Sequence, residues 1–415
     1  MVTQRGREKS LERRLRAFHW VRMLAELPGR LAGSEGERAG ALRIQEELHE
    51  IGFEEVRTEA VASRPRVGWV LGLHMGLAAL GCWLGGAPGV LMAGLAAWSF
   101  RREFRGGRPL LSRWLPAPES VNVVGRAGAG AERPRQRVVL SAHIDVAQAG
   151  WIFSEESANW FAGRAQARVD GAGPPPGPHA LPEWLVLAAA ALALASWLGA
   201  GGLLVGLVRF LLGAGLAVGA GLTLQWAAAR PSPGANDNAS AVAAMLTCGE
   251  QLLASLPEDT ELWVVGTGAE EVGCCGMTAF CREHADWPRD ASFFVNFECV
   301  GGGALHWVRS EGTLVKTVFP PLLTELARRV AASGAFGELT PVDLMAATDG
   351  HVPARLGFAS VSLIALEANG VPRHYHREGD TPEALDMDTV VRAADFGAAV
   401  ARVALRGEAG PIAIV

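Results

Sequence analysis

Charged residues, lysine and tyrosine are all scarce in this chain of 415 residues. Only 20% of the residues are charged and the formal net charge is −5, which is not the balance of a protein that binds a polyanion. We therefore expect no nucleic-acid partner. Nearly half of the chain (49%) is hydrophobic, which excludes disorder. The 51 glycines and 23 prolines follow no repeat period, so collagen and solenoid folds are excluded as well.

Cysteine is also rare, and its spacing lacks the repeated CxxC pairs of a structural zinc site. The six cysteines are Cys82, Cys248, Cys274, Cys275, Cys281 and Cys299. We expect them to be reduced and buried, as is typical of proteins that face the cytosol. Residues 1–18 are charged and lack an apolar core, so we expect no cleavable signal peptide.

Two long apolar blocks stand out against this background. Residues 67–100 contain no Asp, Glu, Lys or Arg, and residues 184–229 contain only Arg209. A membrane-spanning helix needs about 20 residues, so each block is long enough for two short spans. Gly85–Gly89 interrupts the first block. The second block turns either at Gly199–Gly202 or around Arg209, which would bring that charge to the membrane interface. We predict two transmembrane helical hairpins; a re-entrant loop in the first block, or buried core helices, are the alternatives.

The rest of the chain has the pattern of a soluble α/β domain. Apolar residues between Leu11 and Leu27 recur at three- and four-residue steps, which predicts a helix. A second helix is expected over Glu35–Ile51, ending at Gly52, and an amphipathic helix over Ala239–Leu253. Residues 171–182, with three consecutive prolines, are expected to form a loop. Apolar strand-like runs separated by helical patterns predict a mostly parallel mixed sheet with helices on both faces.

Metal-capable side chains follow four of the strand-like runs. The runs start at Val138, Leu262, Phe293 and Val361, and after them come His143 and Asp145, then Glu270 and Glu271, then Glu298, and last a loop with His374, Tyr375, His376 and Asp380. Ligands of parallel sheets bind beyond the carboxyl ends of the strands, where these side chains would converge. Asp237 precedes the third helix and, taken alone, would be a helix N-cap.

Six segments together resemble the M28 family of zinc metallopeptidases, the aminopeptidase-type enzymes with two co-catalytic metals. They are Ser141–Asp145 (SAHID), Gly234–Ala243 (GANDNASAVA), Gly268–Gly273 (GAEEVG), Asn296–Glu298 (NFE), Thr348–Phe358 (TDGHVPARLGF) and His374–Glu383 (HYHREGDTPE). The resemblance is loose over residues 10–60 and good over 120–405, outside the apolar blocks. It implies the fold of the zinc aminopeptidases and phosphorylase-like hydrolases.

The resemblance also implies a role for each residue. Two zinc ions would be bridged by Asp237, with His143 and Glu298 completing one site and Glu271 and His376 the other. Zinc accepts imidazole nitrogen and carboxylate oxygen, and two zinc ions about 3.5–4 Å apart can act together on a substrate.

The remaining residues would assist the metals. Glu270 would be the general base that activates a water between them, Asp145 would support His143, and Asp380 would support His376. Tyr375 either packs or donates a hydrogen bond to the tetrahedral oxyanion, and both interpretations stay open. Without the resemblance, Glu270 and Glu271 would be a solvated acidic pair. His374 is expected at the loop surface, and His351 is a reserve ligand.

This chain departs from the family pattern at two places. Many relatives have Asp where this chain has Glu298. In addition, the apolar blocks interrupt the catalytic domain, and one of them separates His143 from Asp237. Because these two residues must meet, the chain between them has to cross the membrane an even number of times. Arginines flank the first block at Arg64, Arg66, Arg101, Arg102, Arg105, Arg108 and Arg113, which places the catalytic domain on the cytoplasmic side of an inner or plasma membrane.

The sequence thus predicts an integral membrane protein in five parts. Residues 1–66 are the N-terminal helical part of a peptidase domain, 67–100 and 183–229 are membrane hairpins, and 101–182 and 230–415 are the two halves of the peptidase domain. The expected function is a membrane-anchored aminopeptidase acting on peptide N-termini. The alternatives are a glutaminyl-cyclase-like enzyme, for which one zinc is typical, a deacylase, or a non-catalytic receptor-like protein. A transporter is disfavoured because the apolar blocks hold one charge.

Overall fold

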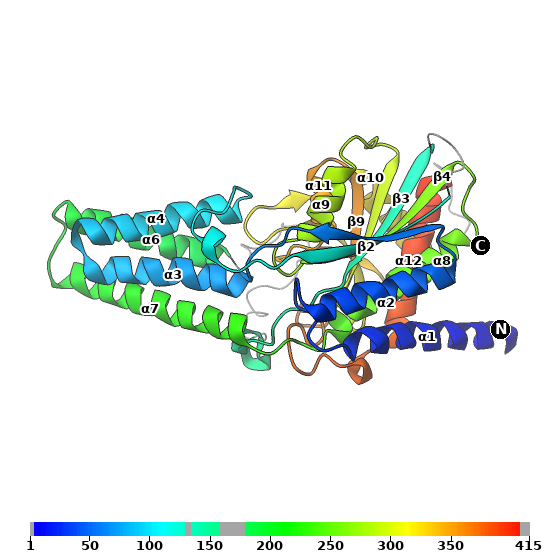
Figure 1. Ribbon diagram of the computed structural model, residues 1–415, viewed down its shortest axis with the longest axis horizontal. Coiled ribbons are helices and arrows are strands. Elements are labelled where there is room, and N and C mark those ends of the chain that lie inside the picture. Colours follow the sequence, from blue (N-terminus) through cyan, green and yellow to red (C-terminus); the bar gives the residue numbers. More distant parts are fainter. Residues whose placement is uncertain (1–3, 129–133, 158–178, 407–415) are drawn as a thin grey trace.

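A large mixed β-sheet forms the middle layer of an α/β domain in the computed structural model, which describes residues 4–128, 134–157 and 179–406 (Figure 1). The nine-stranded sheet has the order β1-β2-β4-β3-β5-β9-β6-β7, with β8 beside β6. Its strands are β1 (Glu55–Val61), β2 (Ser120–Ala127), β3 (Gln136–His143), β4 (Thr260–Thr267), β5 (Ser292–Glu298), β6 (Ala304–Glu311), β7 (Thr317–Val318), β8 (Thr340–Asp343) and β9 (Ala359–Leu366).

Parallel pairing is largely confined to the middle of this sheet. The strands β4, β3, β5 and β9 pair in parallel, and they are the four strand-like runs followed by metal-capable residues. Toward the edges, β2 pairs antiparallel with β4, β1 with β2, and β6 with β9. The mixed α/β class is confirmed, whereas the expected predominance of parallel strands holds only for the centre and for the β6–β8 pair at one edge.

Helices cover both faces of the sheet, as expected. One face packs against α1 (Gln4–Ala25), α2 (Glu35–Ile51), α8 (Ala241–Leu253), α10 (Pro321–Ala332) and α12 (Met387–Arg406). The other face packs against α9 (Cys275–Glu283) and part of α11 (His351–Arg355). Strand alternation divides the core between these layers, because Val138 and Leu140 belong to the first cluster and Val139 to the second. The Ser34 hydroxyl caps α2, which ends at Gly52 with φ of 107° as predicted.

Four further helices form an elongated bundle that extends from one end of the α/β domain (Figure 1). They are α3 (Val67–Leu84), α4 (Gly86–Phe104), α6 (Ala180–Trp197) and α7 (Leu203–Ala228). The break between α3 and α4 falls at Gly85, as predicted. The second turn falls between Trp197 and Leu203, so the interpretation with a turn at Arg209 is wrong. Arg209 lies inside α7, where its Nε donates to the Cys82 carbonyl near the end of α3 at 3.0 Å.

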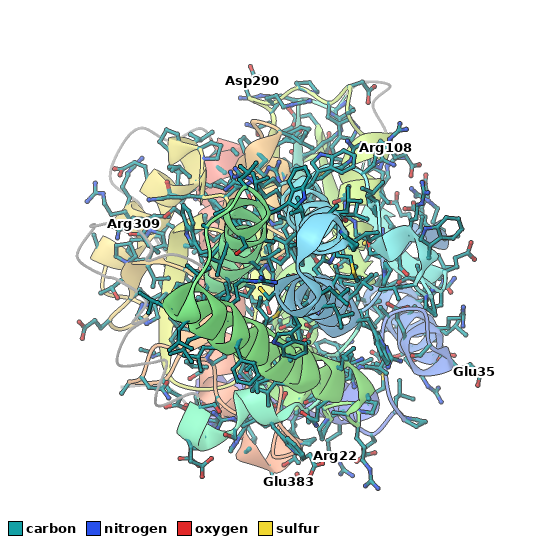
Figure 2. All side chains as sticks on the ribbon, turned by 90° about the vertical axis from the view of Figure 1, so that its left-hand side faces the viewer. Arg22, Glu35, Arg108, Asp290, Arg309 and Glu383 are labelled. Carbon is teal, nitrogen blue, oxygen red and sulfur yellow. The ribbon has the colours of Figure 1, made fainter. Side chains whose placement is uncertain are left out.

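The outside of this bundle is apolar. Its exposed side chains include Leu80, Trp83, Leu91, Trp98, Trp184, Trp197, Leu203, Leu204, Phe210 and Val218. Figure 2 looks along the bundle, and the labelled charged side chains lie at the periphery on the surrounding α/β domain. Three helices, α3, α6 and α7, are long and apolar enough to cross a membrane. The remaining helix, α4, ends in Arg101, Arg102 and Glu103, so the two spanning hairpins stay a prediction. Of the expected loop over 171–182, residues 180–182 belong to α6, and residues up to 178 lie outside the described ones.

Candidate metal centre

The predicted ligands meet at one edge of the sheet. His143 is the last residue of β3 and Glu298 the last of β5, while Glu271 follows β4 and His376 follows β9. Because these four strands are parallel, their carboxyl ends lie together. Asp237 comes from the irregular segment Ala235–Ser240 that leads into α8.

Asp237 lies between the two imidazoles. Its Oδ1 is 3.3 Å from His143 Nε2, and its Oδ2 is 3.1 Å from His376 Nε2. All three side chains are at most 5% exposed. One carboxylate therefore presents a separate oxygen to each histidine, which is the arrangement expected of a bridging ligand.

The other two carboxylates complete the two halves. Glu298 Oε1 lies 3.3 Å from His143 Nε2, and Glu271 Oε2 lies 3.3 Å from His376 Nε2. Ligand atoms about 2.0–2.1 Å from a tetrahedral zinc lie about 3.3–3.4 Å from one another. The contacts with His143 and His376 thus have the spacing of atoms that share a metal.

Several polar atoms of these residues are buried without a hydrogen-bond partner among the described residues. They are both oxygens of Asp237, Oε1 of Glu271, Oε2 of Glu298 and both ring nitrogens of His376. Buried polar atoms are nearly always satisfied, so such a convergent group needs an explanation. Two imidazoles and three carboxylates are a ligand set that zinc accepts, and the residues therefore fit the metals that the sequence predicts.

The buried carboxylates of the centre lie close together, and positive charge between them would stabilise their ionised forms. Burial would lower the pKa of His376, but the facing charges of Glu271 and Asp237 raise that pKa to about 10. Burial opposes the charge of Asp237, yet the two imidazoles that face it hold the Asp237 pKa below its ordinary value. Burial raises the pKa of Glu298. Crowded, buried carboxylates are stabilised by positive charge.

Glu270 lies beside the predicted ligands, but its carboxylate is farther from the nearest imidazole than theirs are. Its Oε2 is 4.0 Å from His143 Nε2, and its Oε1 accepts a hydrogen bond from the Cys274 thiol at 3.2 Å. Burial raises the pKa of Glu270 well above its ordinary value. Strand β4 ends at Thr267, so Glu270 and Glu271 both lie in the turn that follows the strand.

Asp145 and Asp380 act on the backbone more than on the histidines. The two oxygens of Asp145 accept the backbone N–H groups of Glu270 and Glu271 at 3.0 and 3.1 Å. His143 Nδ1 lies 3.0 Å from the Asp145 carbonyl oxygen and 3.7 Å from its carboxylate.

Asp380 differs further from expectation. Its carboxylate accepts the N–H groups of Asn236 and Asp237 at 2.7 and 3.0 Å. His376 Nδ1 has no hydrogen-bond partner among the described residues, so the expected Asp380–His376 contact is absent there. Asp380 instead fixes the segment that presents Asp237.

Tyr375 stacks on the ring of His376, with centroids 3.8 Å apart and planes at 21°. Its side chain also packs against the cluster of Cys299 and Leu366. The two roles predicted for Tyr375 therefore stay open. His351 Nδ1 lies 2.7 Å from the Thr348 carbonyl oxygen and has no contact with the ligand set among the described residues.

Sequence reasoning missed three buried charged residues that support this centre. The Arg30 guanidinium donates to the carbonyls of Ile144 and Gly234 at 3.0 and 2.9 Å, which ties the β3 loop to the Asp237 segment. Glu37 accepts the Ala269 N–H at 3.0 Å and so fixes the turn that carries Glu270. Arg30 and Glu37 each lie more than 100 residues from these partners in the chain, so no sequence pattern within one segment predicts the contacts.

Asp349 is the third missed residue, and here a signal was available. It lies within the TDGH segment and forms a compact group with Glu270 and Cys274. The Thr267 hydroxyl donates to Asp349 Oδ2, and burial raises the Asp349 pKa to about 6.

The comparisons with known proteins bear on the family and the fold of this chain. Residues 221–401 match the family model described as Peptidase family M28. No curated protein matches in sequence. The resemblance to the M28 peptidases is thereby confirmed, and it supports a metal-dependent peptidase.

Solved structures share the fold. The zinc aminopeptidase BSAP from Bacillus subtilis aligns with a TM-score of 0.56 at 15% identity, covering 94% of each chain. An aminopeptidase from Aneurinibacillus sp. strain AM-1 aligns with a TM-score of 0.54 at 15% identity, covering 94% of this chain and 93% of its own. The glutaminyl cyclase of Fimbriiglobus ruber aligns with a TM-score of 0.51 at 14% identity, covering 92% of each chain.

Proposed function

We propose that this M28-related chain is a membrane-anchored zinc aminopeptidase that binds two zinc ions and hydrolyses peptide N-termini. The observation behind the proposal is the position of Asp237, which turns one oxygen toward each of two buried imidazoles. Each imidazole also faces one further carboxylate, so the ligands fall into two matched halves.

Glu270 is the proposed general base. When bound, the zinc ions polarise the scissile carbonyl and lower the pKa of the attacking water. The Glu270 carboxylate lies 4.0 Å from His143 Nε2, beside the ligand set, and is proposed to accept the proton of the water and return it to the leaving amine. The Tyr375 phenol, on the face of His376, is proposed to donate a hydrogen bond to the oxyanion.

The helix bundle is the proposed membrane anchor, and the lipid bilayer is then a partner of this chain. Exposed leucine and tryptophan side chains around the bundle would be costly in water and are favourable in lipid. We keep the division into peptidase parts (1–66, 101–182 and 230–415) and hairpins (67–100 and 183–229). The catalytic domain is proposed to face the cytoplasm. Of the flanking arginines, Arg101 and Arg105 pair with buried Glu183 at 3.4 and 3.0 Å, which leaves the other arginines to set the orientation.

A glutaminyl-cyclase-like activity is the second candidate, because a glutaminyl cyclase shares the fold over 92% of this chain. The two candidates differ in chemistry, since a cyclase closes an N-terminal glutamine on itself and needs no water as nucleophile. Release of free N-terminal residues, with two zinc ions per chain, favours the aminopeptidase. Formation of pyroglutamate with one zinc ion favours the cyclase.

Asp237→Ala tests the metal centre. We expect zinc content, measured by elemental analysis of the detergent-solubilised protein, to fall well below that of the wild type, together with loss of aminoacyl-reporter hydrolysis. Asp388→Ala is the matched control, because Asp388 is 72% exposed and pairs only with Arg14 among the described residues. Normal zinc and full activity in Asp237→Ala would contradict the proposal.

A further inference from the structure

Within the described part of the chain, His376 Nδ1 lacks the polar partner that metal-binding histidines generally have. Such histidines usually donate their second ring N–H to a carboxylate or carbonyl, which fixes the orientation of the ring. His376 Nδ1 is buried and has no such partner among the described residues, and Asp380 is engaged with the backbone of Asn236 and Asp237. Some other contact must therefore orient this ring.

Aromatic rings surround His376 instead. Tyr375 stacks on one side, and the edge of Phe153 meets the imidazole with centroids 4.5 Å apart at 69°. Trp226 lies beyond, nearly parallel to the imidazole at 6.4 Å, and it contacts Phe153 at 5.2 Å and 69°. Aromatic pairs at such separations prefer these orientations, so each contact favours one arrangement of the two rings.

Trp226 belongs to the last turn of α7, so this ring comes from the helix bundle. Its position is closely determined. The indole Nε1 donates to the Gln148 carbonyl at 3.1 Å, and Gly150 lies so near that a Cβ there would come within 2.7 Å of the indole ring. Next to it, Gln225 Oε1 accepts the Trp151 N–H at 3.0 Å.

Phe153 is fixed from its other side. The Arg377 guanidinium donates to the Phe153 carbonyl at 2.6 Å, and Arg377 directly follows His376 in the chain. The segment 148–153 is therefore bound both to α7 and to the loop that carries the metal ligand.

We infer that Trp226 is a positioning residue for His376, acting through Phe153, so that helix α7 is a structural part of the metal centre. The inference rests on the proposed function, since it concerns one of the two proposed metal sites. It makes a bundle helix necessary for full metal affinity, beyond its proposed use as an anchor.

Three variants test this. Trp226→Ala removes the ring, Trp226→Phe restores an aromatic ring without the indole N–H, and Trp197→Ala removes a tryptophan that is 56% exposed on α6 of the same bundle. Metal affinity is measured on the detergent-solubilised full chain by competition with a zinc chelator. Changes in partners behind a metal ligand typically cost about 10–100-fold in affinity. We expect about a tenfold loss at one metal site in Trp226→Ala, recovery in Trp226→Phe, and wild-type affinity in Trp197→Ala.

Cobalt substitution gives a readout that is independent of activity. The visible d–d absorption of bound cobalt reports its coordination, so Trp226→Ala should alter that spectrum and Trp197→Ala should not. Gly150→Ala provides a second route if Trp226→Ala does not fold. Gly150 has an ordinary φ of −86°, so the added methyl group acts by displacing the Trp226 side chain, and the same weakened site is expected.

Two results would overturn the inference. One is wild-type metal affinity and an unchanged cobalt spectrum in Trp226→Ala or Gly150→Ala. The other is an equal loss in Trp197→Ala, which would mean a general effect of the bundle. Asp237→Ala separates this failure from failure of the proposed function. If Asp237→Ala loses zinc while Trp226→Ala keeps it, the metal centre stands and only the role of Trp226 is wrong.

Discussion

Glu270 and Glu271 are adjacent in the chain, yet the structure assigns them to different positions in the centre. Glu271 lies at 3.3 Å from His376 Nε2, the spacing of atoms that share a metal, whereas Glu270 comes no closer than 4.0 Å to His143 Nε2. Changing each to Gln is a small perturbation. The backbone of both residues stays bound to Asp145, and in Glu270→Gln the side-chain amide oxygen can still accept the Cys274 thiol hydrogen bond.

We expect the two variants to fail in different ways. Glu270→Gln cannot accept a proton from water, and a general base contributes about 10²–10⁴-fold to the rate. Hydrolysis should therefore fall at least about a hundredfold, which corresponds to about 2.7 kcal/mol of transition-state stabilisation, with zinc content near that of the wild type. Glu271→Gln should lose zinc first, and activity as a consequence.

The assay pairs elemental analysis of each purified variant with initial rates on a panel of aminoacyl reporter substrates. Glu258→Gln, an exposed change in the turn before β4, is the matched control. Normal turnover by Glu270→Gln would refute the hydrolytic mechanism. Opposite behaviour of the two variants would exchange the roles of the two residues. Equal zinc loss in both would show that the shorter carboxylate–imidazole distance of Glu271, 3.3 Å against 4.0 Å for Glu270, does not distinguish a ligand from a base.

Three further outcomes can be checked. A reporter fused after Val415 should be cytoplasmic, and external protease should leave the catalytic domain of spheroplasts intact; ready cleavage would overturn the orientation. Arg30→Met should lower the free energy of unfolding by more than about 3 kcal/mol in urea titrations, because it removes charged hydrogen bonds worth about 1.5–3 kcal/mol each from buried carbonyls; a change below about 1 kcal/mol would argue against this. Burial raises the pKa of Glu311, the last residue of β6, from 4.5 to about 8. Between these two pH values the folded protein keeps a proton that the unfolded chain releases. The free energy of unfolding therefore decreases as pH rises from 4.5 to 8. In chelator-treated protein, Glu311→Gln should therefore gain in Tm relative to the wild type between pH 5 and pH 8.5, and a constant difference in Tm would contradict the assignment.

The sequence by itself determined the four central strands, three of the helices, the two apolar blocks and the chemistry of the predicted metal ligands. The apolar runs ending at His143 and Glu298 are short and rich in β-branched and aromatic residues, so local pattern was enough to predict strands. The stop at Gly52 and the break at Gly85 follow from the conformational freedom of glycine, which is also local. The resemblance to M28 peptidases added a predicted role for each site residue, because its six segments occur in order.

Only the tertiary structure decided how those residues are supported. Arg30 reaches the carbonyls of Ile144 and Gly234, and Asp380 binds the backbone beside Asp237, over separations of more than 100 residues. Such contacts depend on how the sheet brings distant loops together, and no pattern within one segment encodes them. The same holds for Trp226, which sequence assigned to an apolar block and which folding brings beside His376. The apolar composition of that block follows from the lipid bilayer that is its proposed surroundings. The direction of one indole ring depends instead on how α7 packs against the segment 148–153.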